Sequence, residues 1–235
     1  MTATDRTCED IIIARLQAAF PTHLVIGEEG SSARGSTNPL TSAPTWLIDP
    51  LDGTTNFVHG FPFVCVSVAL AVNHQVVVGV VHNPILHETF TALRGAGAFR
   101  NDKGIRVSDV QVLAKALAGT EVGVSRDPIV MNAITDRIHK VAARTRSIRA
   151  SGSCAMALCG VAMGRLDAFY EIGFGGPWDV AAGSLIVEEA GGSVLDPSGK
   201  EFRLMGRRVL ATNAHLGVEM AEILDGALKA EGEPQ

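Results

Sequence analysis

The residues from Gly53 to His87 include no aspartate, glutamate, lysine or arginine, and this uncharged stretch constrains the fold more than any other feature. Its longest apolar run covers residues 61–72 and is interrupted only by one proline and one serine. A membrane-spanning helix needs about 20 consecutive apolar residues, so this run is too short to cross a bilayer. β-Branched residues at 64–72 and 76–81 instead predict a hairpin of two strands buried in a core.

Composition places the chain among folded proteins that are not basic. Its 235 residues fit one large domain or two small ones. Hydrophobic residues make up 46% and charged residues 19%, a balance that excludes intrinsic disorder. The net charge is -5, whereas a protein that binds nucleic acid through bulk charge is basic. We therefore expect no nucleic-acid partner and no membrane insertion.

The four cysteines, Cys8, Cys65, Cys154 and Cys159, include no CxxC pair and have no accompanying histidine cluster. This pattern favours reduced core thiols over a disulfide framework or a zinc site. The first ten residues lack the pattern of a signal or transit peptide. We therefore expect a cytoplasmic protein, with a plastid location as the alternative if a targeting segment precedes Met1.

Hydrophobic periodicity divides the chain into two halves. In the first half, a helix at 8–20 precedes a mostly antiparallel sheet, with a polar surface loop at 30–43. Besides the hairpin, strands are predicted at 23–26, 46–48, 88–93, 97–99 and 105–107. The second half alternates strands at 116–124, 147–150, 167–171, 193–195 and 208–211 with helices at 128–143, 154–163, 178–190 and 215–229. The boundary is expected near residue 112, giving an α+β half at 1–112 and an α/β half at 113–235.

The most specific chemistry lies in residues 46–57, which read WLIDPLDGTTNF. An apolar strand here delivers the carboxylates of Asp49 and Asp52 into a turn that contains proline and glycine. Carboxylates at a strand end, with turn carbonyls beside them, suit a hard cation such as Mg²⁺. The alternative is an Asx-type turn in which the two carboxylates only accept hydrogen bonds from backbone N–H groups.

Two further acidic elements occur at the ends of predicted strands or helices. Glu28 follows an apolar run in GEEG, and Asp179 opens a helix in GGPWDVAAG. Taken singly, Glu28 also fits a solvated turn, and Asp179 fits a favourable charge at a helix start. Taken together with the first segment, they favour one site that holds two or more divalent ions.

The spacing within DPLDGT separates this segment from a near neighbour. Haloacid dehalogenase-type phosphatases carry an aspartyl nucleophile in a DxDGT segment, whereas one more residue separates Asp49 from Asp52 here. The extra residue rotates the second carboxylate relative to the first. The spacing therefore favours metal ligands and a water nucleophile over a phospho-aspartate.

Two long signatures carry a family resemblance. IDPLDGTTNFVHGFPF at 48–63 and PWDVAAGSLIVEEAGG at 177–192 resemble the inositol monophosphatase family, and the resemblance covers nearly the whole chain. FPFVCVSVAL, RASGSCAMALCGVAMGRLDAFYEIGFGGPWD and DPSGK are most similar to plant and algal members, which act on inositol monophosphates and L-galactose 1-phosphate. The resemblance implies a layered αβαβα sandwich of the inositol monophosphatase and fructose-bisphosphatase type, a homodimer and sensitivity to lithium.

The resemblance also implies a set of two or three Mg²⁺ ions as cofactor. Glu28, Asp49 and the carbonyl of Leu51 resemble the ligands of the first ion. Asp49, Asp52 and Asp179 resemble those of the second, and Glu28 helps to hold a weaker third ion through waters. Most of these ligands fall in the half at 1–112, while Asp179 comes from the half at 113–235.

Other positions match residues that act on the water and the phosphate. Thr55 resembles the hydroxyl that orients the attacking water, with Asp5 as its carboxylate partner. Gly53 and Thr54 resemble the groups that contact the phosphate, and Asp52 is expected to face the substrate as well as a metal ion.

The remaining matches concern the part of the substrate beyond the phosphate. Gly152, Ser153 and Cys154 match a segment at a helix start that contacts the sugar or inositol ring. Glu171 matches the residue that accepts hydrogen bonds from substrate hydroxyls.

The predicted function is therefore Mg²⁺-dependent hydrolysis of a small polyol or sugar phosphate monoester, by a metal-activated water. Inositol 1-phosphate and L-galactose 1-phosphate are the expected substrates. Alternatives within the superfamily are a nucleotide bisphosphatase, a fructose-bisphosphatase or a histidinol-phosphatase. A truncated, weakly active or non-catalytic form is a further alternative, because family members carry another helical segment before the position of Met1.

Overall fold

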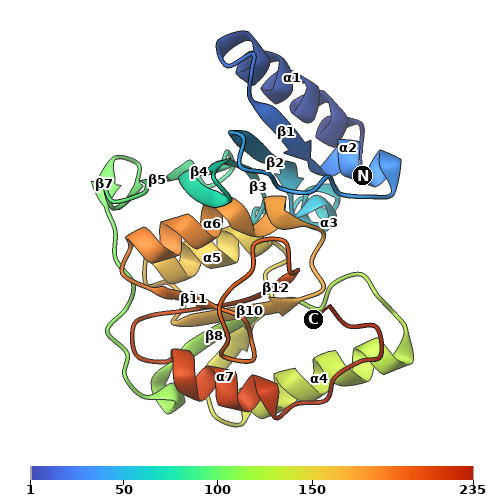
Figure 1. The fold of residues 1–235 in the computed structure, drawn as a ribbon. Coiled ribbons are helices and arrows are strands. Elements are labelled where there is room, and N and C mark those ends of the chain that lie inside the picture. Colours follow the sequence, from blue (N-terminus) through green and yellow to red (C-terminus); the bar gives the residue numbers. More distant parts are fainter. Residues whose placement is uncertain (1, 235) are drawn as a thin grey trace.

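The computed structural model describes residues 2–234 and arranges them in alternating layers of helix and sheet (Figure 1). Helices α5 (Cys154–Ala162) and α6 (Pro177–Glu189) lie between two sheets. Helix α1 (Ala3–Ala19) covers the outer face of the first sheet, and α4 (Pro128–Ala142) and α7 (Gly217–Asp225) cover the outer face of the second. This order of layers confirms the predicted αβαβα sandwich.

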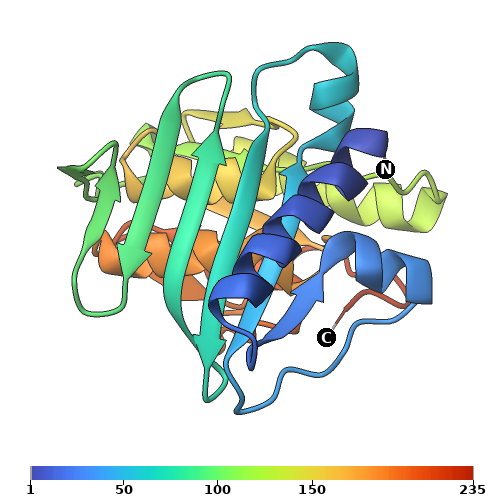
Figure 2. The ribbon, with the colours of Figure 1, turned by 90° about the horizontal axis from the view of Figure 1, so that it is seen from above.

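The first sheet has seven strands that follow one another in chain order. β1 pairs in parallel with β2, and every later pair is antiparallel. Figure 2 shows α1 lying across the face of this sheet. The strands are β1 (Leu24–Gly27), β2 (Thr45–Asp52), β3 (Cys65–Val72), β4 (Gln75–Asn83), β5 (Glu88–Leu93), β6 (Ala98–Arg100) and β7 (Lys103–Gly104).

The hairpin predicted in the uncharged stretch is confirmed as β3 and β4. Residues along β3 alternate between buried and half-buried, which is the period of a strand with one face on a core. Asn73 and His74 form the turn with φ angles of 51° and 65°. Two consecutive positive φ angles define the turn type that matches the twist of a two-residue hairpin.

The second sheet has the strand order β11-β12-β10-β8-β9. β8 pairs in parallel with β9 and β10, while β12 is antiparallel to β10 and β11. The sheet is therefore mixed. Its strands are β8 (Leu117–Thr120), β9 (Ser147–Arg149), β10 (Ala168–Ile172), β11 (Ser193–Leu195) and β12 (Arg208–Thr212), and a short 3₁₀ turn at Leu113–Lys115 precedes β8.

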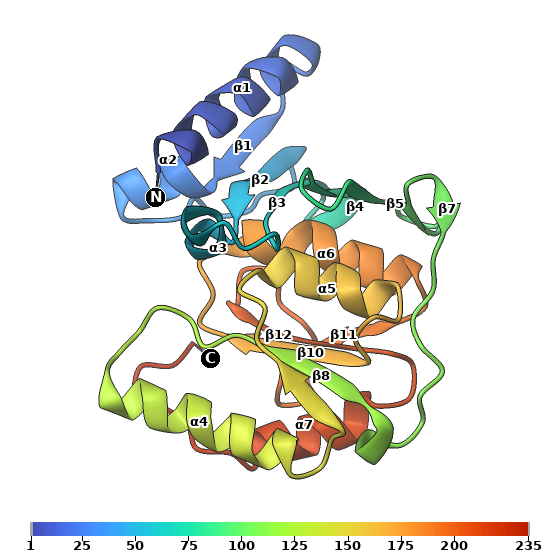
Figure 3. The same ribbon diagram turned by 180° about the vertical axis from the view of Figure 1, so that it is seen from behind.

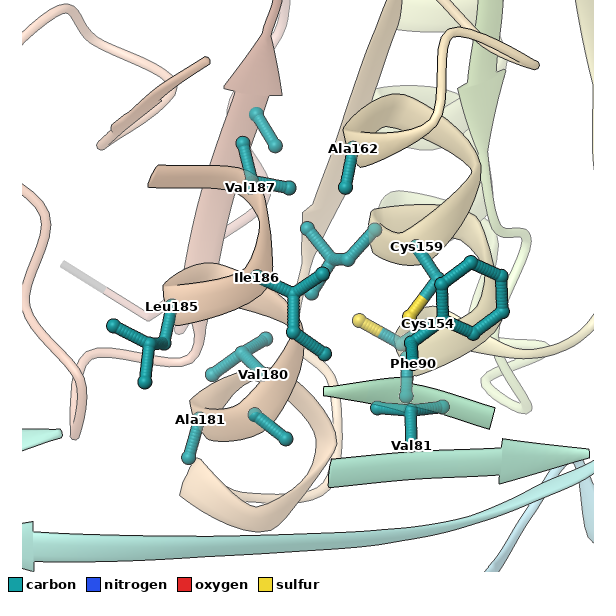
Figure 4. Close-up of a cluster of buried hydrophobic side chains, with 14 of the residues drawn as sticks. Val81, Phe90, Cys154, Cys159, Ala162, Val180, Ala181, Leu185, Ile186 and Val187 are labelled. Carbon is teal, nitrogen blue, oxygen red and sulfur yellow. The ribbon is translucent and has the colours of Figure 1, made fainter. Parts of the chain in front are cut away.

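The core is centred on α5 and α6, whose side chains are buried on almost every side. Figure 4 shows Ile186 of α6 pointing toward α5, and the ring of Phe90 from β5 beside Cys159 of α5. Glycine permits the closest contacts, because a Cβ at Gly183 would lie 2.6 Å from Leu158. Helices from the second half thus pack against the first sheet, and the boundary near residue 112 stays a prediction.

Three local predictions differ from the structure. The predicted loop at 30–43 begins with helix α2 (Glu28–Arg34), which ends at Gly35 with a φ of 66°. Helix α3 (Thr54–His59) follows the aspartate segment where only a turn was expected. Residues 105–107 form no strand, although the N–H groups of Ile105 and Val107 donate to Ala98 and Ala190. Within residues 2–234, no helix is long and apolar enough to span a membrane.

Candidate active site

Asp49 lies near the end of β2, where the pairing with β3 changes register. The side chain is only 2% exposed, and its Oδ1 accepts a hydrogen bond from the Leu51 N–H at 2.9 Å. That bond is the Asx-type contact that the sequence offered as the alternative to metal binding, and it leaves Oδ2 of Asp49 outside the contact. Because a register shift changes the direction of the strand, the residues after Asp49 turn away from regular pairing with β3.

Asp52 lies where β2 meets the start of α5. Its Oδ2 accepts hydrogen bonds from the Ser153 hydroxyl at 2.6 Å and from the Ala155 N–H at 2.7 Å. The following residue, Gly53, has a φ of 90°, and a Cβ there would lie 2.8 Å from the Phe63 carbonyl oxygen. Only glycine fits at this position without strain.

Asp179 lies in the first turn of α6, directly after Pro177 and Trp178. Its Oδ2 accepts hydrogen bonds from the N–H groups of Gly175 at 2.8 Å and Gly176 at 3.4 Å. Proline in the first turn and an acidic residue beside it are both typical of a helix start. Figure 3 shows α3 beside the N-terminal end of α6, so the aspartate segment and Asp179 face the same region.

Glu28 opens helix α2, and a second acidic residue supports that helix from α1. The Glu9 carboxylate accepts hydrogen bonds from the N–H groups of Glu29 at 3.1 Å and Gly30 at 3.2 Å. Glu9 was not predicted as part of the site, because its partners lie 20 and 21 positions along the chain. It fixes the start of α2, and with it the position of Glu28.

Burial raises the pKa values of all four carboxylates, and neighbouring negative charges add to the rise for Glu28, Asp49 and Asp179. Burial raises the pKa of Glu28 to about 7, with additional repulsion from Glu29, Asp52 and Asp5. Burial is also the largest cause of the raised pKa values of Asp49, Asp52 and Asp179, with repulsion between these carboxylates adding to it for Asp49 and Asp179. A buried set of anions that repel one another fits a hard divalent cation.

The fit to a cation rests on donor chemistry and on one unpartnered atom. Among residues 2–234, no three acidic, histidine or cysteine side chains already form a compact ligand cluster, and Asp52 and Asp179 each accept a hydrogen bond from a backbone N–H group. The Oε2 atom of Glu29 is buried and has no hydrogen-bond partner within the described chain. Oxygen donors of this kind are what Mg²⁺ takes from proteins.

This electrostatic arrangement predicts how stability depends on pH. Without divalent cations, the folded protein holds protons on Glu28 between its ordinary pKa of 4.5 and its raised pKa of about 7. The folded state then binds more protons than the unfolded chain, so the free energy of unfolding falls as pH rises through this window. We expect a lower Tm at pH 8 than at pH 6, and a larger rise in Tm on adding Mg²⁺ at pH 8. Differential scanning calorimetry in chelator and in Mg²⁺ measures both, and an equal Mg²⁺ effect at the two pH values would contradict a repelling carboxylate set.

The structure corrects the predicted pairing of Asp5 with Thr55. The hydroxyl that donates to Asp5 belongs to Thr54, at 3.2 Å, and the same oxygen lies 3.1 Å from the Leu51 carbonyl. Thr55 is exposed and lines the cavity. The two threonines open α3, and successive residues on a helix point about 100° apart. Only one of them can therefore face Asp5, which is itself 1% exposed.

A cavity of about 590 Å³ lies beside the carboxylates. It brings together Asp52 and Asp179 with the predicted substrate residues Gly152, Ser153, Cys154 and Glu171. Ser153 caps α5 and donates to Asp52, and Cys154 is buried behind it.

Glu171 stands on β10 at the wall of this cavity. Its Oε2 has no partner among residues 2–234. Burial, with repulsion from Asp179, Glu121 and Asp52, raises its pKa well above the ordinary value. Such a carboxyl is available to a polar ligand.

Two cavity residues were not predicted from the sequence. Asn56 donates its amide hydrogens to the carbonyls of Phe63 at 2.8 Å and Ser151 at 2.7 Å. Glu121 follows β8 and accepts hydrogen bonds from the N–H groups of Ser151 and Gly152. Asn56 lies inside the specific segment and could have been singled out there, whereas no local pattern marks Glu121.

Comparison with known proteins places this geometry in context. Residues 1–229 match the family model described as the inositol monophosphatase family. A relative from Solanum lycopersicum named inositol monophosphatase 2 is 62% identical over 92% of this chain and 82% of its own length. Human inositol monophosphatase 1 is 43% identical over 93% of this chain and 79% of its own length. A solved structure of inositol monophosphatase from Anabaena superposes with a TM-score of 0.88 at 34% identity, covering 97% of this chain and 88% of the other.

Proposed function

The chain belongs to the inositol monophosphatase family, and from that premise we propose that it hydrolyses a small polyol or sugar phosphate monoester with the help of Mg²⁺. The observation that carries the proposal is the mutual repulsion of carboxylates from three separate elements, Glu28, Asp49, Asp52 and Asp179, two of which, Asp52 and Asp179, line one cavity. A phosphate monoester carries nearly two negative charges at neutral pH. An acidic cavity binds such a ligand only with bound cations.

The proposed metal ligands follow from this arrangement. Glu28, Asp49 and the Leu51 carbonyl would hold one ion, and Asp49, Asp52 and Asp179 a second. Glu28 would also help to hold a third, weaker ion. When bound, Mg²⁺ neutralises the phosphate, lowers the pKa of water and stabilises the leaving oxygen. The backbone donors to Asp52 and Asp179 keep these side chains aimed at the cavity.

The proposed attack is prepared by Thr54 and Asp5. Burial acts to raise the pKa of Asp5, but hydrogen bonds from Thr2 and Thr54 outweigh it and lower the pKa overall. An ionised Asp5 accepts the Thr54 O–H, so the other side of the Thr54 oxygen is free to accept a hydrogen bond from a water molecule. The lone pair of that water is then aimed at phosphorus, which is a positioning effect of the kind that accelerates displacement.

Different residues would hold the two ends of the substrate. The Thr55 hydroxyl and the backbone N–H of Gly53 are proposed to donate to phosphate oxygens. At the far side of the cavity, the carboxyl of Glu171 would accept hydrogen bonds from substrate hydroxyls. The turn at 152–154 would contact the ring. A polyol or sugar carries hydroxyls that can donate hydrogen bonds to Glu171. The presence of this acceptor favours such substrates over a nucleotide.

Replacing Glu171 with glutamine tests whether this residue contacts the hydroxyls of the substrate. An amide still bonds a hydroxyl but loses the charge-assisted part of the contact. We expect kcat/KM to fall by about tenfold, from about 1.5 kcal/mol of lost interaction, and to fall unequally for inositol 1-phosphate and L-galactose 1-phosphate. Phosphate release is measured for wild type and variant on both substrates and on a nucleotide bisphosphate. An equal loss of kcat/KM on all three substrates, together with weaker Mg²⁺ activation, would contradict the substrate contact and indicate that Glu171 supports metal binding instead.

Three further properties belong to the same proposal. The family resemblance supports inhibition by Li⁺ and a homodimeric assembly, and the pattern of reduced cysteines supports a cytoplasmic location. A nucleotide bisphosphatase, fructose-bisphosphatase or histidinol-phosphatase activity remains the alternative, and the same substrate panel separates them. Preferential release of phosphate from the nucleotide bisphosphate would select that alternative.

A further inference from the structure

Glu121 is the acidic residue of the cavity that the proposed mechanism leaves without a role. It directly follows β8, is half-buried, and lines the cavity with Asp52 and Glu171. Both oxygens of its carboxylate accept hydrogen bonds from one turn, residues 151–153. Oε1 accepts the Ser151 N–H at 3.0 Å, and Oε2 accepts the Gly152 N–H at 2.8 Å.

The same turn is held from its other side by the aspartate segment. The Asn56 amide donates to the Ser151 carbonyl at 2.7 Å. Gly152 has a φ of 80°, and a Cβ there would lie 2.7 Å from the Asn56 side chain. A Cβ at Gly53 would lie 3.1 Å from the Gly152 carbonyl oxygen. The turn at 151–153 therefore has contacts on two sides. Glu121, directly after β8 of the second sheet, binds it from one side, and Gly53 and Asn56 of the aspartate segment contact it from the other.

The turn leads directly to the donors that orient Asp52. Ser153 follows Gly152, and its hydroxyl reaches Asp52 Oδ2 at 2.6 Å. The Ala155 N–H reaches the same oxygen at 2.7 Å. A displacement of the turn moves both donors together, because they belong to the same cap of α5.

We propose that Glu121 is a positioning residue, whose carboxylate fixes the turn at 151–153 and thereby the Ser153 and Ala155 donors that orient Asp52. This inference rests on the proposed function, since Asp52 is a metal ligand and substrate contact only in that account. Glu121 acts through the turn and needs no contact with substrate. The hydrogen bonds from the two N–H groups favour the ionised carboxylate, but burial outweighs them and raises the pKa of Glu121 to about 7.

The chain offers a matched control for this arrangement. Both carboxylate oxygens of Glu189 also accept hydrogen bonds from a glycine turn, from the N–H groups of Gly95 and Gly97 at 2.8 Å each. It lies at the end of α6, ten positions after Asp179 and on the order of 15 Å away along the helix axis. Glu189→Gln removes the same kind of contact far from the cavity.

The test compares Glu121→Gln with Glu189→Gln in the full chain. A glutamine presents only one acceptor oxygen, so it loses one of the two N–H bonds. We expect both variants to lose a similar few degrees of Tm, but only Glu121→Gln to lose kcat, by about tenfold to 100-fold. The loss should appear on both inositol 1-phosphate and glycerol 2-phosphate, because Asp52 would serve either substrate. In a calorimetric titration of metal-free protein, Mn²⁺ should bind Glu121→Gln severalfold more weakly than it binds Glu189→Gln.

A double-mutant cycle with Ser153→Ala locates the effect. If Glu121 acts through Ser153, Glu121→Gln must cost less in the Ser153→Ala background than in wild type. Independent effects, a loss confined to inositol 1-phosphate, or unchanged kcat and Mn²⁺ affinity would each overturn the inference. Glu121→Asp, which keeps the charge but reaches less far, supplies the comparison if the glutamine variant does not fold. An inactive wild type would instead refute the proposed function, and the Mn²⁺ titration then still decides the role of Glu121.

Discussion

Replacing Asp49 with asparagine should lower kcat on inositol 1-phosphate by at least about 10³-fold, because the ions that it is proposed to hold would supply several kcal/mol of transition-state stabilisation. Asp49 would serve as a ligand in both main ion sites, and an amide oxygen is a poor ligand for Mg²⁺. Its hydrogen bond from the Leu51 N–H survives in the variant, since an amide oxygen accepts it equally well. The fold should therefore persist.

The same variant should gain stability in the absence of divalent ions. Asp49 is repelled by Asp52, Glu28 and Asp179, and removing its charge removes those three repulsions. We expect Tm in chelator to rise, while the Mg²⁺-dependent rise in Tm shrinks. Asp225→Asn, an exposed aspartate paired with Lys229, is the control and should leave both quantities unchanged. Turnover of Asp49→Asn within tenfold of wild type would refute its assignment as a metal ligand.

The second large effect separates two neighbouring threonines. Thr54→Ala should lower kcat by roughly 10²-fold or more, because the variant loses the hydroxyl that would position the attacking water. Thr55→Ala should cost no more than about tenfold, the value of a single hydrogen bond to phosphate. The reason is structural, since only Thr54 donates to the buried carboxylate of Asp5.

Serine at position 54 provides the rescue for this comparison. Thr54→Ser keeps the hydroxyl and should retain most of kcat, and Asp5→Asn should resemble Thr54→Ala. Steady-state phosphate release by the four variants measures the difference. A larger loss in Thr55→Ala than in Thr54→Ala would restore the pairing that the sequence first suggested.

The sequence predicted those parts of the fold that depend on local periodicity. Alternation along residues 64–72 and 76–81 identified the central hairpin, because one face of each strand lies on the core. Helix α2 was missed, since GEEGSSAR contains poor helix formers. That helix is held at its start by Glu9, whose bonds cross 20 positions of chain. No local sequence pattern predicts such a long-range contact.

The residues of the candidate site likewise include some that the sequence predicted and others that only the structure revealed. Asp49 and Asp52 lie in one dense motif, and Asp179 opens a recognisable helix, so the sequence alone singled them out. The choice between Thr54 and Thr55 depends on where α3 begins, and sequence patterns do not place a helix end to one residue. Glu121 holds a turn 30 positions away, and only the assembled layers bring the two together.

Phosphate release from inositol 1-phosphate, followed as Mg²⁺ is returned to the chelator-treated 235-residue chain, tests the central claim most directly. The account predicts no measurable release in chelator, a saturable return of activity with Mg²⁺, and inhibition by Li⁺ at fixed Mg²⁺. Release that persists undiminished in chelator would show that the buried carboxylates do not act through a divalent ion, and would contradict the account.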